Sequence, residues 1–231
     1  MKTIGLIGGM SWESTIPYYR LINEFVRARR GGHHSAELIL VSVDFHEFEA
    51  MLRAGDWAGI ASRLTGAARK LEAAGADLLV LCTNTMHKVA PEIAAAVAIP
   101  LLHILDPTVD AIHAANLRSV GLLGTRFTME QDFYRDRLAS RHGLQVLVPE
   151  PVDREVVNRV IFEELTQGRV LDGSRAAYRR VIAALVARGA QGIVLGCTEI
   201  AMLIGPGDAG VPVFDTTALH AEHAAEYALS V

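Results

Sequence analysis

The sequence predicts an α/β protein of two pseudo-symmetric lobes, each with a mostly parallel sheet flanked by helices. Short apolar runs alternate with stretches of helical periodicity along the 231 residues, which is typical of βα units. The sequence also contains an internal repeat, since residues 79–83 (LVLCT) are matched by residues 194–198 (VLGCT). Two further pairs follow in the same order and at nearly constant spacing, residues 3–8 with 119–124 and residues 99–102 with 211–214. A duplicated α/β unit explains all three matches.

The expected strands are the short apolar runs of each half. They lie at residues 3–8, 38–43, 77–82, 100–104, 118–123, 144–148, 192–197 and 211–214. Between them, apolar residues recur at helical spacing and are interpreted as core-facing stripes, at Trp57, Ile60, Leu64, Ala67, Leu71, Tyr178, Val181, Ile182 and Leu185. We therefore predict a first lobe over residues 1–116 and a second over residues 117–215, with a C-terminal helix at 216–231 that can cross back to the first.

Composition and charge exclude several classes of function. The formal net charge of -4 and the scattered arginines leave no basic field for a nucleic acid backbone. No apolar run is long enough to span a bilayer, so a soluble cytoplasmic protein is expected. Neither a dinucleotide-binding nor a phosphate-binding glycine motif is present, and no cofactor is expected. His220 and His223 lack a third ligand at motif spacing, so we interpret them as a solvated helix face and expect no metal.

The two cysteines, Cys82 and Cys197, end equivalent strands of the two halves. Ligands of open parallel sheets bind beyond the carboxyl ends of the strands, which is where both thiols are expected to point. A thiol titrates near pH 8.5, so small shifts allow one thiolate and one thiol to coexist as base and acid. Either cysteine alone would be read as a buried apolar residue. Their matched positions instead favour a catalytic pair that removes and returns the α-proton of an amino acid.

Polar residues follow each cysteine at a strand-to-helix junction. Thr83, Asn84 and Thr85 follow Cys82, and Thr198 and Glu199 follow Cys197. Free backbone N–H groups collect at a helix start, where they bind carboxylates and lower the pKa of a nearby thiol. We expect Asn84, Thr85 and Thr198 to hold the α-carboxylate of the substrate, the alternative being plain helix caps.

Three segments, residues 8–15 (GGMSWEST), 81–87 (LCTNTMH) and 196–199 (GCTE), resemble the aspartate/glutamate racemase family over essentially the whole chain. With residues 42–46 (SVDFH) and 123–134, the chain is similar to the broad-specificity amino-acid racemase branch found in enteric bacteria. The resemblance implies a pyridoxal-independent, commonly dimeric enzyme that uses two cysteine bases on a small amino-acid substrate. It also implies substrate contacts at Met10 and at the residues after each cysteine, Thr83, Asn84, Thr85, Thr198 and Glu199.

Departures from the family pattern bear on the substrate. Cell-wall glutamate racemases carry Asp-Ser after the first strand and a histidine two residues after the second cysteine. This chain has Gly9-Met10 and Glu199 at those places, which disfavours a role in peptidoglycan synthesis. Members selective for acidic substrates use a basic or amide side chain where this chain has Leu52 and Arg53. Arg53 can hold a second carboxylate, so acidic, neutral and mixed substrate sets all stay open.

Two alternatives remain at this point. Relatives of the superfamily isomerise maleate, racemise hydantoins or decarboxylate malonates with cysteines at strand ends, so another reaction on the same scaffold is possible. A protein of a different class, which binds a small molecule without turning it over, would also keep the fold. Incorporation of solvent deuterium at Cα of an unchanged amino acid separates a racemase from both.

Overall fold

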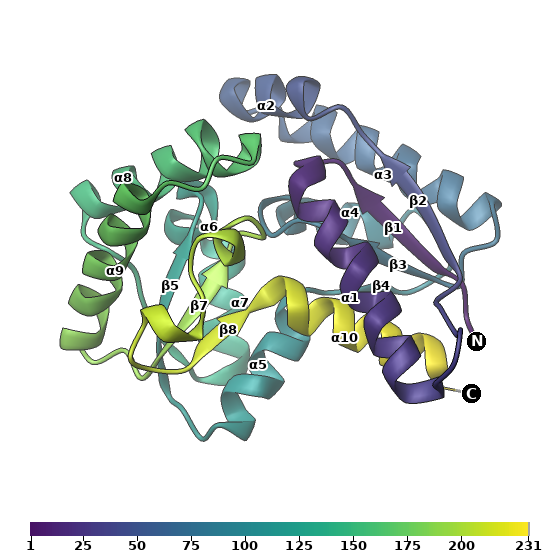
Figure 1. The fold of residues 1–231 in the computed structure, drawn as a ribbon. Helices are drawn as coiled ribbons and strands as arrows, with labels where there is room; N and C mark the ends of the chain where they lie inside the picture. Colours follow the sequence, from purple (N-terminus) through teal and green to yellow (C-terminus); the bar gives the residue numbers. More distant parts are fainter. Residues whose placement is uncertain (231) are drawn as a thin grey trace. The chain divides into compact units, whose positions relative to one another are not determined.

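The computed structural model describes residues 1–230, with the backbone alone at 140–142, and it divides into two compact units (Figure 1). The first unit consists of Met1–Ile104 together with His220–Val231, of which residue 231 lies outside the described part, and the second is Leu105–Leu219. No helix in residues 1–230 is both long enough and apolar enough to cross a membrane.

The first unit contains a four-stranded sheet in the order β2-β1-β3-β4, and all of its strand pairs are parallel. The strands are β1 (Ile4–Gly8), β2 (Leu38–Ser42), β3 (Leu78–Leu81) and β4 (Leu101–Leu102). The helices are α1 (Trp12–Arg30), α2 (Phe45–Ala54), α3 (Trp57–Ala73), the 3-10 helix η1 (Thr85–Val89), α4 (Ala90–Ala94) and most of α10 (Thr216–Leu229).

The second unit repeats this topology with a parallel sheet in the order β6-β5-β7-β8. Its strands are β5 (Ser119–Gly124), β6 (Gln145–Leu147), β7 (Gly192–Gly196) and β8 (Val213–Asp215). Its helices are α5 (Leu105–Ala114), α6 (Arg126–Glu130), α7 (Asp132–His142), α8 (Pro151–Glu163), α9 (Asp172–Ala187) and the 3-10 helices η2 (Leu165–Gln167), η3 (Ile200–Met202) and η4 (Pro206–Asp208). In each sheet the first strand is central and the third lies beside it. The predicted α/β class and all eight expected strands are confirmed, with ends that shift by one or two residues.

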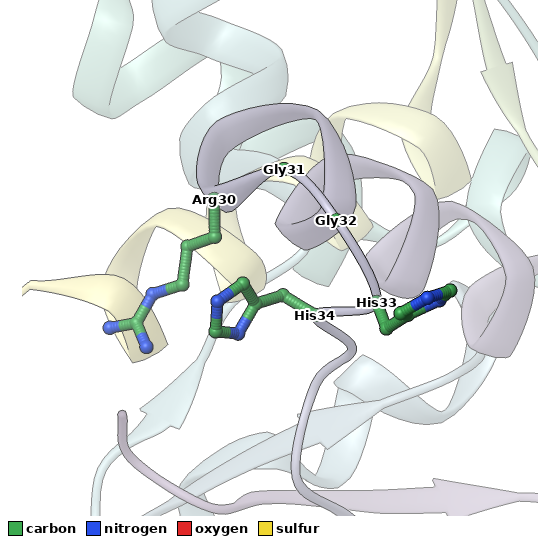
Figure 2. A pocket seen from close by; sticks show the side chains of 5 residues that line it. All are labelled: Arg30, Gly31, Gly32, His33 and His34. Atoms are coloured by element: carbon green, nitrogen blue, oxygen red, sulfur yellow. The ribbon is translucent and has the colours of Figure 1, made fainter.

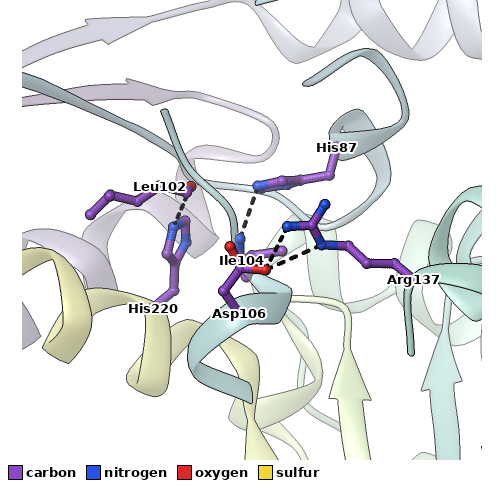
Figure 3. Close-up of polar contacts among 6 residues, drawn as sticks. All are labelled: His87, Leu102, Ile104, Asp106, Arg137 and His220. Carbon is purple, nitrogen blue, oxygen red and sulfur yellow. Dashed lines mark hydrogen bonds and ion pairs between the residues drawn. The ribbon is translucent and has the colours of Figure 1, made fainter. Parts of the chain in front are cut away.

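The boundary between the units lies one helix earlier than the predicted break after residue 116. Helix α5 belongs to the second unit, because it packs on α7 and β8. The guanidinium of Arg137 on α7 donates to the carboxylate of Asp106 on α5 at 2.5 Å (Figure 3). The prediction placed these residues in the first lobe, because the sequence pattern carries no information about which sheet the segment between two strands covers.

The predicted core stripes are confirmed except at their first position. On α3, Ile60 and Leu64 are completely buried, as is every stripe residue of α9 from Tyr178 to Leu185. Trp57 at the start of α3 is only half-buried, and the ammonium group of Lys88 lies 4.0 Å from the centre of its ring. The helix start therefore carries a cation–π contact instead of a core residue.

The C-terminal helix supplies a row of small residues to the core of the first unit. Ala221, Ala224, Ala225 and Ala228 of α10 recur on one helix face and are fully buried against α1. The residues of α1 that belong to the same cluster are Tyr18, Ile22 and Val26. The alanine side chains share one buried cluster with α1, so α10 completes this core even though it begins in the second unit.

A glycine turn connects β1 to the residues that precede α1. Gly9 has a φ of 92°, and a Cβ atom built on it would lie 2.2 Å from the carbonyl oxygen of Val43. Its N–H donates to Oγ1 of Thr15 at 2.8 Å. Only glycine fits both the backbone angle and the close approach of the chain after β2. The turn therefore fixes where Met10 leaves the sheet.

We predict that Gly9→Ala lowers the free energy of unfolding by about 2 kcal/mol or more, since it adds a clash to a backbone angle that alanine avoids. The matched control is Gly66→Ala in α3, where a Cβ atom meets nothing within 4 Å. There alanine should stabilise the helix by about 0.5–1 kcal/mol. Urea unfolding followed by circular dichroism measures both changes, and equal midpoints for the two variants would refute the interpretation of the turn.

Candidate active site

The two cysteines occupy equivalent positions in the two sheets. Cys82 directly follows β3, which pairs with β1, and Cys197 directly follows β7, which pairs with β5. The backbone N–H of Cys82 donates to the carbonyl oxygen of Ile7 at 2.9 Å, which extends the β1–β3 pairing to the cysteine itself. Each unit thus carries one thiol at the carboxyl end of its third strand, which is where ligands of parallel sheets bind.

The Cys82 thiol lies in an apolar environment. Its side chain has no exposed surface, and the hydrogen-bond partner of Sγ is the carbonyl oxygen of Val80 at 3.8 Å. Burial raises the pKa of this thiol far above its ordinary value. The environment of Cys82 therefore favours the neutral thiol.

The residues that follow Cys82 form a buried turn. Thr83, Asn84 and Thr85 are all buried, and the 3-10 helix η1 that begins at Thr85 has only five residues. The expected lowering of the thiol pKa was wrong at Cys82. Burial of the thiolate raises the Cys82 pKa instead.

The Cys197 thiol differs from Cys82 because it contacts a carboxylate. Sγ of Cys197 donates to Oε2 of Glu199 at 3.1 Å, and the hydroxyl of Thr198 donates to the same oxygen at 2.8 Å. All three side chains are buried. Burial and the negative charge of Glu199 raise the pKa of Cys197 well above its usual range. The expected lowering was wrong here as well, and Glu199 is the second reason.

Two buried tyrosines lie near Cys197 and were not predicted as site residues. The charge of Cys197 contributes, after burial, to the raised pKa of both Tyr134 and Tyr178. A Cβ atom on Gly196 would lie 3.4 Å from the Tyr134 hydroxyl, which places that hydroxyl beside the residue before Cys197. The hydroxyl of Tyr178 donates to the carbonyl oxygen of Val157 at 2.9 Å. Tyr134 ends the segment 123–134 that carries part of the family resemblance. Its approach to β7 depends on the packing of α7, which the sequence pattern does not give.

Of the two remaining predicted binding residues, Met10 is buried and Arg53 is exposed. Met10 is buried directly after the Gly9 turn, near the carboxyl end of β1. Arg53 lies on α2 with 80% of its side chain exposed, and its guanidinium pairs with Glu49 of the same helix. Its neighbour Leu52 is buried. A role for Arg53 in substrate binding thus rests on the family resemblance alone.

His220 is not where the sequence suggested, and a second buried histidine had not been singled out. His220, expected on a solvated helix face, is completely buried and bonded to Tyr18 and to the carbonyl of Leu102. It faces inward because the alanine row of α10 turns this side of the helix toward the core. His87, to which no role was assigned, is buried in η1 and bonded to Thr83. The side chains of residues 1–230 that the structure describes include no group of three or more potential metal ligands.

A pocket of about 370 Å³ lies away from the cysteines, at the C-terminal end of α1 (Figure 2). It is lined by Arg30, Gly31, Gly32, His33 and His34, all of which are exposed. Figure 2 shows the Arg30 and His34 side chains close together and the His33 ring directed elsewhere. A single exposed turn forms this pocket, and none of the predicted site residues belongs to it.

The contact with Glu199 makes the two thiols distinguishable by their reactivity. We predict that Glu199→Gln lowers the Cys197 pKa and speeds its alkylation by iodoacetamide at pH 8 on the order of tenfold, because it removes a like charge beside the thiolate. Alkylation of Cys82, measured by peptide mass spectrometry in the same sample, should not change.

The matched control is Glu163→Gln on α8, where the side chain is 64% exposed. It should leave both rates at their wild-type values. An unchanged Cys197 rate in Glu199→Gln would show that the charge of Glu199 does not control this thiol.

Comparison with known proteins agrees with this geometry over nearly the whole chain. The profile of the Asp/Glu/Hydantoin racemase family matches residues 7–224. The broad specificity amino-acid racemase RacX of Bacillus subtilis (strain 168) is 23% identical over 218 residues, which cover 93% of each protein.

Solved structures extend the likeness. A candidate Asp/Glu racemase from Yersinia pestis is 59% identical and superposes with a TM-score of 0.92, with complete coverage of both chains. An aspartate racemase homologue from Pyrococcus horikoshii OT3 is 37% identical with a TM-score of 0.85, also over both complete chains. With two parallel sheets of the same topology and a family match across both, the chain belongs to the Asp/Glu/Hydantoin racemase family.

Proposed function

We propose that this chain racemises amino acids by proton transfer at Cα, with Cys82 and Cys197 as the two acid–base groups. The observation that carries the proposal is the equivalence of the two thiols, each at the carboxyl end of the third strand of a duplicated sheet. The racemase names of its relatives support the same chemistry. One thiolate takes the α-proton, the opposite thiol donates a proton to the other face, and the roles reverse for the other enantiomer.

The Glu199 contact bears on the protonation states of the free enzyme. The carboxylate of Glu199 accepts a hydrogen bond from Sγ of Cys197, which favours the protonated thiol. Sγ of Cys82 donates to the carbonyl oxygen of Val80 in a buried apolar environment, which also favours the thiol. We therefore propose that both cysteines are thiols in the free enzyme and that one of them loses its proton only when substrate binds.

The polar residues near each thiol suit the parts of an amino acid. We propose that Asn84, Thr85 and Thr198 bind the α-carboxylate, because their side chains are buried, directly follow the cysteines and carry amide or hydroxyl donors. In this proposal the Thr198 hydroxyl turns from Glu199 to the substrate. Thr83, Met10 and Glu199 complete the binding surface in this proposal.

For the substrate side chain, we propose a broad range in which Arg53 contacts only acidic substrates. The high exposure of Arg53 and its pairing with Glu49 support an accessory role for this side chain.

We also propose a homodimer that packs α1 against the α1 helix of a second copy. Trp12, Ile16 and Tyr19 are 58%, 47% and 61% exposed and follow one another at helical spacing. Arg20 and Arg27 are also exposed, further along the same helix. In an antiparallel pair, the aromatic side chains of one copy meet the arginines of the other, which is a self-complementary arrangement.

The proton-transfer proposal is tested in heavy water with a panel of L- and D-amino acids. Proton NMR should show loss of the α-proton signal and formation of the enantiomer with the wild-type protein. Cys82→Ser and Cys197→Ser should each lower racemisation by at least about 100-fold, because each removes one of the two bases.

The alternatives give different results in this experiment. A related isomerase or decarboxylase would leave the α-proton in place for every amino acid of the panel. A binding protein would gain thermal stability from an amino acid without any exchange. Full racemisation by either cysteine variant would rule out the two-base mechanism.

The dimer proposal predicts that Ile16→Arg converts a dimer into a monomer, since it places a charge at the centre of the apolar stripe. Size-exclusion chromatography with light scattering measures the mass. Val152→Arg is the matched control, because Val152 is 74% exposed on α8 and lies outside the stripe. A wild-type protein that is monomeric at tens of micromolar would exclude this interface.

A further inference from the structure

We propose that His87 is a positioning residue that holds the turn after Cys82 in its binding conformation. This inference rests on the proposed function, in which Asn84 and Thr85 bind the substrate carboxylate. His87 is 3% exposed and lies within η1, so its ring reaches back to the residues that directly follow the cysteine. It acts through the backbone of Thr83 and does not itself touch the reacting atoms in this proposal.

Two backbone groups determine which ring nitrogen of His87 carries the proton. The N–H of Ile104 donates to Nε2 at 3.2 Å, so Nε2 must be the unprotonated nitrogen (Figure 3). Nδ1 then carries the hydrogen, which it donates to the carbonyl oxygen of Thr83 at 2.7 Å. His87 is therefore a neutral imidazole with one donor and one acceptor, each already used.

This imidazole joins two segments that are distant in sequence. Thr83 follows β3, whereas Ile104 lies two residues beyond β4, and the ring bridges the two chain segments where they leave the sheet. All three residues are buried, so water is not at hand to replace a lost bond. The bridge therefore restrains the Thr83 carbonyl, and through the peptide bond it restrains Asn84.

Neighbouring rings hold His87 in place. The ring centres of His103 and His220 lie 4.5 and 5.9 Å from that of His87, both in edge-on contact. His220 is itself fixed, since its Nε2 donates to the Leu102 carbonyl at 3.0 Å (Figure 3). Its Nδ1 accepts from the Tyr18 hydroxyl at 2.9 Å. The cluster thus limits rotation of the His87 ring and preserves both of its hydrogen bonds.

The same turn is tied by a second, local bond. The backbone N–H of His87 donates to the carbonyl oxygen of Asn84 at 3.1 Å, which closes the first turn of η1. Main chain and side chain of one residue therefore restrain the carbonyls of two consecutive residues, Thr83 and Asn84. This arrangement orients the Asn84 and Thr85 side chains before substrate arrives, which is the preorganisation that a carboxylate site requires.

Two substitutions of His87 each keep one of its two side-chain hydrogen bonds and remove the other. An asparagine amide nitrogen overlays Nδ1, so His87→Asn keeps the donor to Thr83 and loses the acceptor for Ile104. A glutamine amide oxygen overlays Nε2, so His87→Gln keeps the acceptor and loses the donor. His34→Gln, on an exposed loop of the same unit, is the matched control.

We expect His87→Gln to raise KM for the amino-acid substrate by about tenfold or more, with a smaller change in kcat, because substrate binding depends on the turn. His87→Asn should keep KM within about threefold of wild type. A purely structural role predicts instead that KM rises in both variants and that thermal stability falls in both to the same extent. Equal KM changes in both variants would overturn the proposal.

Hydrogen–deuterium exchange supplies a readout that does not depend on activity. The peptide that covers residues 82–89 should exchange faster in His87→Gln than in His87→Asn, while peptides of the second unit should not change. This result is expected even if the wild-type protein shows no racemisation, so failure of the proposed function and failure of the positioning role are distinguishable. Identical exchange in both variants would also overturn the proposal.

Discussion

The candidate site depends on one constraint, the parallel pairing of the third strand beside the first in each sheet. That register brings Leu81 beside Ile7 and Gly196 beside Gly124, so each cysteine begins where its strand ends. Parallel strands leave all their carboxyl ends on one edge, and that edge also receives the Gly9 turn and the polar residues after Cys82. A shift of one residue in either strand would turn the thiol to the opposite face of the sheet.

Although the two halves share a topology, their thiols have different electrostatic environments. Burial is the main cause of the raised pKa in both, but Cys197 also lies beside a carboxylate, whereas Cys82 donates to a backbone carbonyl. The two positions are equivalent in the sheets, but the groups that contact the two thiols differ. The proposed racemisation needs both groups to exchange the roles of acid and base, so each cysteine must be able to gain and lose a proton during turnover.

The sequence predicted the fold well because apolar residues recur at regular spacing and because the α/β unit occurs twice. Strand ends, the stripe of α9 and the equivalence of the cysteines all follow from patterns that neighbouring residues determine. It failed where long-range packing decides, as at α5, which no local pattern assigns to a sheet, and at His220, whose burial depends on the approach of α1. The raised thiol pKa values were missed for the same reason, since burial is a property of the tertiary structure.

Helix α10 has a consequence for how the protein is made. The first unit is discontinuous in sequence, because the alanine row that completes its core lies after the whole of the second unit. During synthesis from the N-terminus, the second unit can therefore finish folding while the first still exposes the surface around Tyr18 and Ile22. Chains that stop short of His220 would carry Cys82 and its turn on an incomplete scaffold. The scaffold around Cys82, unlike that around Cys197, thus forms fully only when the last helix has been made.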